Sequence, residues 1–385
     1  MSALSLAKLA QGLAARYPAR YGLTLGLEEL RVRVRSNSAA VVGDLRGYFK
    51  AFVVADTGPA DLEILALDGP VEEPPVALAA RPPAPGKRPD KERFVDVQGT
   101  APGAGPGGGR LVRKQATGML FLFGQGWNIA VNIAVGPCAA NRNQLVNFLC
   151  ARYMERRLAA GWMLGHAAGV VRPAPDGDKA LALCGFAGMG KSTLALHLLT
   201  RGLDFLSNDR VLVEPAGPGR GPVLHGIPKH PRLNPGTALG NPALVPYLAG
   251  ALPEAARRAY AGLTPEALRA VEDKFDAPID SCFGPPAGSS RFRLAAPLSG
   301  VVVLNWKHGG GPLITRRVDL EERRDLLQAL RREPGVFYLP QALGAGARLT
   351  PEQCLEAVHG VPALELTGGA DFEAGAAACE EFLGG

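Results

Sequence analysis

The sequence predicts an α/β protein of two domains, and three observations support this. From about residue 163 onward, short apolar segments typical of strands alternate with capped helical segments, which is the pattern of an α/β domain. Residues 185–192 read GFAGMGKS and fit the pattern G-x-x-x-x-G-K-[ST] of a phosphate-binding loop. Residues 71–109 are rich in proline and glycine, which marks a linker. We therefore expect a smaller α+β domain over residues 1–139, followed by a loop-containing domain over residues 140–385.

The composition excludes several classes of protein. Hydrophobic residues make up 47% of the 385 positions and charged residues 20%, values typical of globular domains and not of disordered or coiled-coil chains. The 42 basic residues exceed the 36 acidic ones by only six, and no basic run is longer than three residues. We therefore expect no nucleic-acid partner.

The longest uncharged segment, residues 115–141, is long enough to cross a bilayer. Its two apolar runs are broken at Gly124-Gln125-Gly126, so we interpret them as paired buried strands. The first 20 residues lack an unbroken apolar stretch and predict an amphipathic helix instead of a signal peptide. The six cysteines form no C-x-x-C pair, which suits a reducing compartment. We expect a cytoplasmic protein with no membrane partner.

The first domain is expected to contain a helix and several strands. Short strands are predicted over residues 30–36, 39–43 and 61–67, with one more at Arg93–Val97 inside the linker. Buried strands resume at residues 111–135. A helix follows, and we place the domain boundary at its beginning. Its expected N-cap is Asn141, its apolar face has Leu145, Phe148, Leu149 and Tyr153, and Gly161 follows its end.

In the second domain, strands are predicted over residues 179–184, 203–206 and 301–306. The helix after the loop spans residues 192–200 and is closed by Gly202. Two further helices are predicted to begin after the capping residues Thr264 and Thr350. A third, which runs through Leu330, is predicted to begin with a capping box of Asp319 and Glu322.

The loop residues predict a site for the phosphates of ATP or GTP. Glycines allow consecutive backbone N–H groups to face a phosphate, and the helix that follows presents its positive N-terminus. Lys191 is expected to reach the β- and γ-phosphates and the Ser192 hydroxyl to hold Mg²⁺. A glycine-rich turn without a ligand is disfavoured, because a strand precedes the motif and a helix follows it. The predicted nucleotide-binding residues are Gly185, Gly188, Met189, Gly190, Lys191, Ser192 and Thr193.

A carboxylate is expected beside this loop. The helix after Gly190 and the returning strand are similar in length, so Asn208-Asp209-Arg210 should lie level with Lys191 at the carboxyl edge of the sheet. Asp209 would then hold Mg²⁺ or accept a proton from a substrate hydroxyl. The alternative is a solvated turn residue.

Two further segments are expected to contribute. A hairpin centred near residues 175–176 places His166 opposite Gly185, where it would tune the aspartate or contact phosphate; the alternative is a half-buried strand histidine. The proline-rich segment 227–237 predicts an irregular loop. Its polar residues are candidate phosphate or substrate contacts, with an ordinary surface loop equally favoured: Lys229, Arg232 and Asn234.

The segments HAAGVV, LCGFAGMGKSTLALHLLTRGL, FLSNDRVLVEP and GIPKHPRLNPGT resemble the HPr kinase/phosphorylase superfamily, and more closely its HPr-kinase-related branch of the kinase B type. The resemblance implies a P-loop kinase fold related to phosphoenolpyruvate carboxykinase, with Mg²⁺, a nucleotide and phosphoryl transfer to a hydroxyl. Ring-like oligomers occur in the parent family, so a homo-oligomer is one assembly that the resemblance allows. That family uses a histidine near the loop, matched by His166, and two adjacent aspartates. Here the first aspartate is replaced by Asn208.

These patterns lead to a Mg²⁺-dependent kinase as the first hypothesis. Lys191 and the loop amides would bind phosphates, Ser192 and Asp209 the metal, and Asp209 would also align or deprotonate the acceptor with His166 and Arg232 assisting. The acceptor is a protein or a small molecule; HPr is not assigned, because the first aspartate is missing and IPKHPRLNPGT stands in place of the parent family's signature region. Residues 1–110 are expected to recognise the acceptor or mediate assembly. The second hypothesis is a catalytically impaired nucleotide-binding sensor or assembly component.

Overall fold

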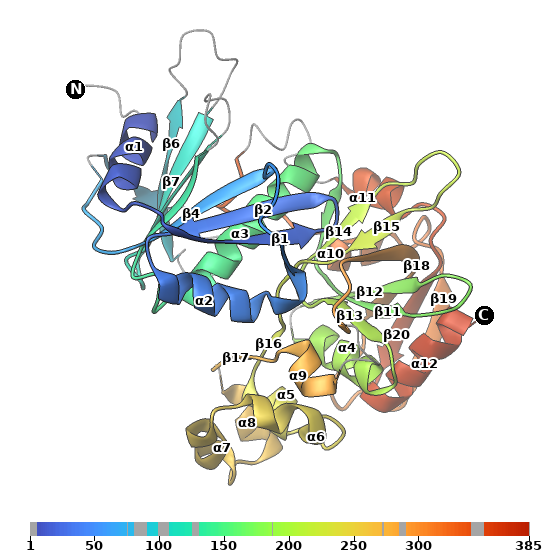
Figure 1. Ribbon diagram of the computed structural model, residues 1–385. Helices are drawn as coiled ribbons and strands as arrows, with labels where there is room; N and C mark the ends of the chain where they lie inside the picture. The colour runs from blue at the N-terminus through green and yellow to red at the C-terminus, as the bar shows by residue number, and fades with distance from the viewer. Residues whose placement is uncertain are drawn as a thin grey trace. The chain divides into compact units, whose positions relative to one another are not determined.

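The chain forms a mixed α/β fold of two units, each with its own large sheet (Figure 1). Unit 1 comprises Met1–Ala160 and Pro334–Ala347, and unit 2 comprises Gly161–Glu333 and Arg348–Gly385. The computed structural model describes residues 6–74, 76–80, 91–98, 108–124, 131–186, 188–271, 273–284, 290–339 and 350–384.

The division between the units falls at Ala160, the end of the helix that we expected to open the second domain at residue 140. This helix, α3 (Arg142–Ala159), packs on the unit 1 sheet because its apolar face meets aromatic side chains there. The ring of Phe148 lies 5.0 Å from that of Phe121 and 5.9 Å from that of Phe123. The chain also returns to unit 1 at Pro334, which no sequence pattern indicated.

The unit 1 sheet has the strand order β3-β1-β2-β4-β9-β8-β7-β6-β5. Strand β2 pairs with β4, and β4 with β9, in parallel; the other pairs are antiparallel. The strands are β1 (Tyr21–Leu27), β2 (Leu30–Ser36), β3 (Val53–Val54), β4 (Leu62–Asp68), β5 (Ala79–Ala80), β6 (Glu92–Gln98), β7 (Gly108–Lys114), β8 (Leu120–Gly124) and β9 (Val131–Gly136).

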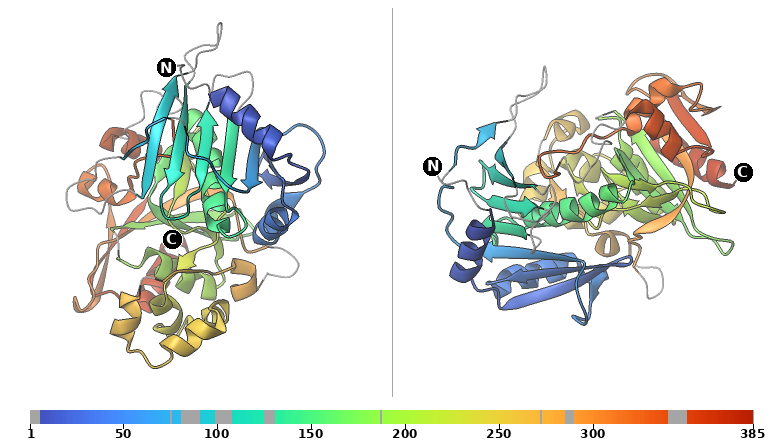
Figure 2. Two further views of the ribbon diagram at one scale, coloured as in Figure 1. Left: turned by 90° about the vertical axis from the view of Figure 1, so that its left-hand side faces the viewer. Right: turned by 90° about the horizontal axis from the view of Figure 1, so that it is seen from above.

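Successive side chains of β8 point to opposite faces of the sheet, and both faces are covered by helices. Leu120 and Leu122 point to the face where helix α1 (Leu6–Arg16) packs (Figure 2). Phe121 and Phe123 point to the opposite face, toward α3. The predicted pairing of two buried strands is confirmed by the antiparallel register of β8 with β9. No helix within the described residues has the length and apolar character needed to cross a bilayer.

Two expectations for unit 1 concern its secondary structure. The strand at Arg93–Val97 is confirmed within β6, which pairs with β7, so this part of the expected linker belongs to the sheet. The ends of the expected linker also reach the sheet, with Ala79–Ala80 as β5 and residues 108–109 at the beginning of β7, whereas its residues 81–90 and 99–107 lie outside the described residues. The strand expected at residues 39–43 is wrong. These residues begin helix α2 (Ala39–Tyr48), because the Ser38 side chain accepts a hydrogen bond from the Val41 amide and caps it.

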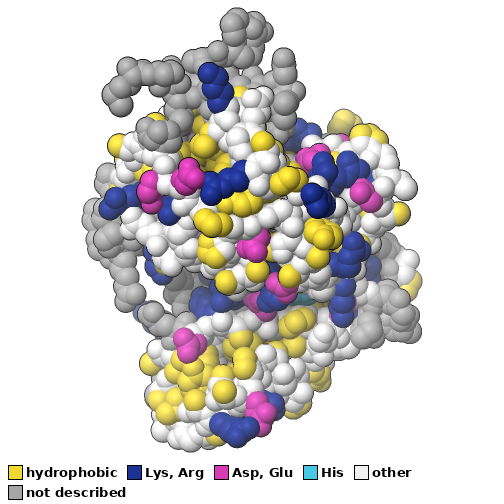
Figure 3. All heavy atoms as spheres, turned by 60° about the vertical axis from the view of Figure 1, so that its left-hand side comes forward, with side chains coloured by type: hydrophobic (Ala, Val, Ile, Leu, Met, Phe, Trp, Pro, Cys, Tyr) yellow, Lys and Arg dark blue, Asp and Glu magenta, His cyan; other side chains and the backbone are white. Residues whose placement is uncertain are grey.

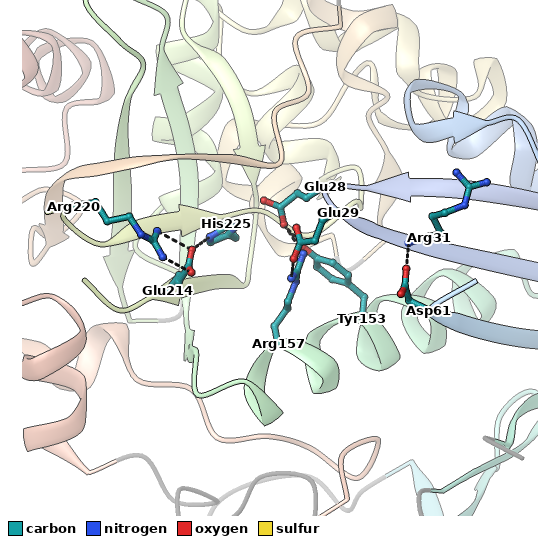
Figure 4. Close-up of polar contacts among 9 residues, drawn as sticks. All are labelled: Glu28, Glu29, Arg31, Asp61, Tyr153, Arg157, Glu214, Arg220 and His225. Carbon is teal, nitrogen blue, oxygen red and sulfur yellow. Dashed lines mark hydrogen bonds and ion pairs between the residues drawn. The ribbon is translucent and has the colours of Figure 1, made fainter. Parts of the chain in front are cut away.

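The turn between β1 and β2 is held by side chains of α3 (Figure 4). Glu28 has a φ of 57°, a left-handed backbone conformation that costs free energy for any residue other than glycine. Its carboxylate accepts a hydrogen bond from the Tyr153 hydroxyl at 2.9 Å and from Arg157 at 3.0 Å, and Arg157 also pairs with Glu29. These contacts fix the turn against the helix within unit 1.

The returning residues Pro334–Leu339, here called the return segment, are bound to unit 1 by two buried arginines. Arg110 forms a bidentate pair with Asp96 and donates to the carbonyls of Val336 at 2.8 Å and Tyr338 at 3.0 Å. Arg152 donates to the carbonyl of Phe337 and pairs with Glu155 at 2.6 Å, with both side chains at most 5% exposed. The Glu155 carboxylate in turn accepts from the Leu339 amide at 2.6 Å.

Substituting Glu155 by alanine is expected to lower the free energy of unfolding by about 3–5 kcal/mol, because the Arg152 charge stays buried without its partner. Chemical denaturation followed by circular dichroism measures this loss. The matched control is Glu73→Ala, whose pair with Arg113 is exposed on the Glu73 side (80%) and should contribute about 0–1 kcal/mol. Equal losses in the two variants would contradict a stabilising role for the buried pair.

The unit 2 sheet has the order β10-β14-β15-β18-β12-β11-β13, with β20 paired to β18 and β19 to β20. Strands β12, β18 and β20 run parallel to one another at its centre. The strands are β10 (Met163–Gly165), β11 (Ala167–Arg172), β12 (Lys179–Gly185), β13 (Asp204–Ser207), β14 (Val211–Glu214), β15 (Val223–His225), β18 (Ala295–Leu304), β19 (Leu313–Val318) and β20 (Ala363–Gly368).

Helices cover both faces of this sheet. Helix α4 (Lys191–Thr200) packs beside α12 (Phe372–Gly384) on one face. Helices α10 (Leu327–Leu330) and α11 (Pro351–Ala357) share a core with β12 and β18 on the other. The strands and the helix predicted around the loop are confirmed, as is the Thr350 cap.

One predicted helix start is wrong. The Asp319 side chain caps only a turn, by accepting from the amide of Glu321, and regular helix begins later as η3 (Arg324–Leu326) and α10.

A small helical lobe is inserted into unit 2 between β15 and β18. It contains a two-stranded ladder of β16 (Arg232–Leu233) with β17 (Phe275–Asp276). Its helices are α5 (Pro235–Leu239), α6 (Val245–Leu248), η2 (Ala249–Ala251), α7 (Glu254–Tyr260), α8 (Pro265–Ala270), capped by Thr264 as predicted, and α9 (Ile279–Phe283). Hydrophobic side chains gather on the surface of this lobe (Figure 3). Tyr247 and Leu263 are two of its exposed large hydrophobic residues.

Candidate functional site

The loop between β12 and α4 is built on glycines and closed by a lysine. Gly188 and Gly190 have φ values of 84° and 83°, a conformation that other residues adopt only with strain. The Lys191 side chain is buried and its ammonium donates to the carbonyls of Gly185 at 2.7 Å and Phe186 at 3.2 Å. Burial lowers the pKa of Lys191, and nearby Asp209 opposes this shift. A cation is thus held at the beginning of α4, where the first amides of the helix have no intrahelical partner.

Two aromatic residues from distant parts of the chain support this loop. A Cβ on Gly190 would lie 2.5 Å from the ring of Phe372, the first residue of α12. The indole of Trp306 donates to the carbonyl of Met189 at 2.8 Å and packs edge-on against Phe372 at 5.3 Å. The Phe372 ring also stacks on His197 of α4. The sequence pattern had not indicated either aromatic residue, because the contacts span more than 100 positions.

The Gly190→Ala variant is expected to melt at a lower temperature than Gly188→Ala. Both positions have the same left-handed φ, for which an L-residue costs about 1–2 kcal/mol. Only at position 190 does the added methyl also meet the Phe372 ring, whereas the space around position 188 is open. Differential scanning fluorimetry of the two variants measures the difference. Equal melting temperatures would show that α12 does not brace the loop.

His166 and Asp209 lie side by side at the edge of the sheet next to the loop. Strand β11 pairs antiparallel with β12, Ala167 lying opposite Cys184, so His166 comes level with Gly185. Strand β13 pairs antiparallel with β11 on its other side, which brings Asp209 to the same edge. The distance from His166 Nε2 to Asp209 Oδ1 is 3.4 Å. The hydrogen bond from His166, with Arg210 and Arg332 nearby, holds the pKa of Asp209 well below its usual range.

These residues line one cavity of unit 2 with a volume of about 490 Å³. From the predicted set it contains His166, Gly188, Gly190, Lys191, Ser192, Thr193, Asn208, Asp209, Arg232 and Asn234. Gly185, Met189 and Lys229 are not among its lining residues. The lining residues that sequence reasoning missed are Leu233, Gly236, Thr237, Gly240, Asn241, Lys274, His308 and Phe372.

In the segment expected as an irregular loop, residues 227–231 have no helix or strand, as expected, whereas residues 232–233 form β16 and residues 235–237 begin α5. Arg232 Nε lies 3.4 Å from Asp276 Oδ1, and its Nη2 donates to the carbonyl of Lys274 at 3.0 Å. The Asn234 side chain caps α5 by accepting from the Thr237 amide at 2.9 Å. Two of the three candidate contacts therefore line the cavity, and in both of them one polar atom, Arg232 Nη2 or Asn234 Oδ1, is already hydrogen-bonded within the lobe.

The charges of this lining favour an anionic ligand. The basic residues that line the cavity are Lys191, Arg232 and Lys274. Asp209 is the one carboxylate in the described lining. The Asp209 side chain is 60% exposed, so its oxygens are open to the cavity.

Magnesium fits the donors that this cavity offers. The Ser192 hydroxyl and the Asp209 carboxylate line the same space, and Mg²⁺ prefers oxygen ligands from one or two carboxylates, water and substrate phosphates. No group of three histidine, cysteine or acidic side chains suited to a metal occurs among the described residues. Such a site would therefore be completed by phosphate oxygens of a ligand and by water.

Comparisons with known proteins find only a distant likeness. No family model matches the chain, and no curated protein matches it. One of the solved structures that it matches is the Hpr(Ser) kinase/phosphatase from Coxiella burnetii, with 11% identity and a TM-score of 0.26. That match covers 57% of this chain and 93% of the other.

Proposed function

We propose that unit 2 binds a magnesium nucleoside triphosphate and transfers its terminal phosphoryl group to a hydroxyl of a protein or small-molecule acceptor. One observation carries the proposal. A glycine-rich loop closed by a buried lysine opens a helix, and an ionised carboxylate lines the same cavity. Phosphoryl transfer depends chiefly on positioning and on stabilising charge, and these residues supply both.

The loop and the first turn of α4 would bind the phosphates. Gly188 and Gly190 give the backbone the left-handed conformation that a phosphate-binding loop requires, and the amides at the beginning of α4 face no helical acceptor. The Lys191 ammonium would exchange its carbonyl partners for phosphate oxygens of higher negative charge.

Ser192 and Asp209 would hold Mg²⁺, which when bound neutralises charge on the phosphates. Because the pKa of Asp209 is low, this carboxylate suits a metal ligand or an acceptor of the hydroxyl hydrogen bond better than a strong base. His166 fixes its position at 3.4 Å. Base strength matters little for a loose phosphoryl-transfer transition state, so alignment of the acceptor is the role that we assign to Asp209.

A second candidate function is that of a nucleotide-binding sensor. Asn208 precedes Asp209 and lines the cavity too, so the carboxylates of this edge are reduced to one. Such a site would still bind the nucleotide through the loop and Lys191. Transfer of the phosphoryl group would be slow, because a second carboxylate is missing.

Label transfer from γ-³²P-labelled ATP and GTP into cell extract tests the proposal directly. With Mg²⁺ and the full-length protein, we expect a labelled product that disappears with a chelator or with Lys191→Ala. Saturable nucleotide binding without label transfer or hydrolysis would favour the sensor. Absence of binding by the wild-type chain would overturn both functions.

A further inference from the structure

The cavity continues from the loop along one face of α4. Gly190 and Thr193 line it, and His197 follows on the same face, because residues three and four positions apart are neighbours on the surface of a helix. His197 is six residues beyond Lys191, which places it about 9 Å along the helix axis at a rise of about 1.5 Å per residue. When the β- and γ-phosphates lie at the loop, the ribose and the base of the same nucleotide can reach this part of the cavity.

His197 is buried, with 2% of its side chain exposed, and it contacts two residues that line the cavity. Its ring stacks on that of Phe372 at a centroid distance of 5.6 Å. Its Nε2 lies 2.8 Å from the side-chain nitrogen of Asn241, and its Nδ1 lies 2.8 Å from Glu373 Oε1. Because a carboxylate only accepts hydrogen bonds, the ring proton belongs on Nδ1, and Nε2 accepts from the Asn241 amide. Burial lowers the pKa of His197, in agreement with a neutral ring.

These contacts determine the orientation of the Asn241 side chain. Its nitrogen is turned toward His197, so its Oδ1 is directed away from the histidine, and no described residue donates to this oxygen. The backbone of Asn241 is fixed as well, since its carbonyl accepts from the amides of Leu244 at 2.9 Å and Val245 at 3.1 Å. Asn241 and Phe372 both line the cavity, which therefore combines a pre-oriented hydrogen-bond acceptor with an aromatic ring.

We propose that Asn241 Oδ1 accepts a hydrogen bond from the exocyclic amino group of a purine base that packs against Phe372. This rests on the proposed function and adds the part of the nucleotide by which the site selects it. An aromatic ring packs against any base, whereas a fixed acceptor selects a base that carries an amino group, because a base without one leaves the acceptor unpaired. His197 is then a positioning residue, which acts on the base only through Asn241.

Calorimetric titration of the full chain tests this with two pairs of magnesium nucleotides, each pair differing only in the amino group. The first pair is ADP with purine riboside 5′-diphosphate, and the second is GDP with IDP. None of them carries a γ-phosphoryl group, so transfer does not disturb the measurement. For the purine that the site accepts, the wild-type chain should bind the amino-bearing member about tenfold more tightly.

Asn241→Leu, which is similar in size but has no acceptor, should bind both members of the pair within about twofold of each other. His197→Phe keeps a ring beside Phe372 but cannot accept from the Asn241 nitrogen. It should reduce the preference for the amino group and leave the affinity for the amino-free member within about twofold. Gln328→Ala, which removes an exposed amide on α10 away from the cavity, is the control and should change neither affinity nor preference.

The outcomes separate this assignment from the proposed function. If the wild-type chain binds none of the four nucleotides, the proposed function fails. If it binds the members of both pairs equally, nucleotide binding stands and the role of Asn241 is overturned. The role is also overturned if Asn241→Leu weakens both members of a pair and keeps the preference, since Asn241 then only supports the lobe. Should Asn241→Leu fail to fold by circular dichroism, Asn241→Ala replaces it with the same expectation.

Discussion

Replacement of Lys191 by alanine is expected to abolish the thermal stabilisation that a nucleoside triphosphate gives to this protein. A ligand at about 100 times its dissociation constant stabilises the native state by about 2.7 kcal/mol. For a unit of this size that corresponds to an increase in melting temperature of roughly 5–10 °C. Without the Lys191 ammonium, the phosphates lose the buried cation at the beginning of α4, and the shift should disappear. Differential scanning fluorimetry with ATP or GTP and Mg²⁺ gives the result.

The matched control for this experiment is Lys179→Ala. Lys179 is the first residue of β12, at the far end of that strand from the loop, and it does not line the cavity. The nucleotide-dependent shift should be intact in this variant. Binding at wild-type affinity in Lys191→Ala would show that the loop is not the phosphate site.

Asp209→Asn is expected to reduce turnover by about 10²–10³-fold while nucleotide affinity stays within about tenfold of wild type. The amide keeps the size of the side chain but loses the charge that orients the acceptor and contributes to the metal site. Lys191 and the loop amides, which carry most of the binding in our proposal, are unchanged. Rates of label transfer, or of phosphate release where no acceptor is present, are compared with direct titration of nucleotide.

Asp176→Asn is the control for Asp209→Asn, because Asp176 is an exposed carboxylate in the turn between β11 and β12. Its rate and affinity should equal those of the wild type. Normal turnover in Asp209→Asn would mean that another residue orients the acceptor, with His166 as the next candidate. Complete loss of nucleotide binding would instead identify Asp209 as the principal metal anchor.

Local patterns were sufficient to predict the centre of the site. The glycine positions, the strand before them and the helix after them are neighbours in sequence, so the motif alone located the loop. His166 was placed by counting residues along one antiparallel hairpin, and Asp209 by comparing the length of the helix after the loop with that of the returning strand; the antiparallel pairing of β13 with β11, which brings the two residues together, was not predicted. These predictions needed no information from distant parts of the chain.

The surroundings of the loop were not predictable in this way. Phe372 and Trp306 support it from more than 100 residues away, and neither belongs to a pattern that differs from an ordinary core residue. The expected strand at residues 39–43 was wrong for a related reason, because an apolar run this short fits a helix as well as a strand. The Ser38 cap decided in favour of helix.

The return segment also has a consequence for the order in which this protein folds during synthesis. Residues up to Ala160 leave the ribosome first, but Phe337 and Leu339, which complete the packing around Phe148 and the hydrogen bonding of Glu155, are made only after most of unit 2. A nascent chain stopped at residue 330 therefore holds the Arg152–Glu155 pair without the backbone partners that satisfy it in the finished protein. The N-terminal unit is begun first but completed late, in contrast to the usual sequence in which an N-terminal domain finishes folding before the next one emerges.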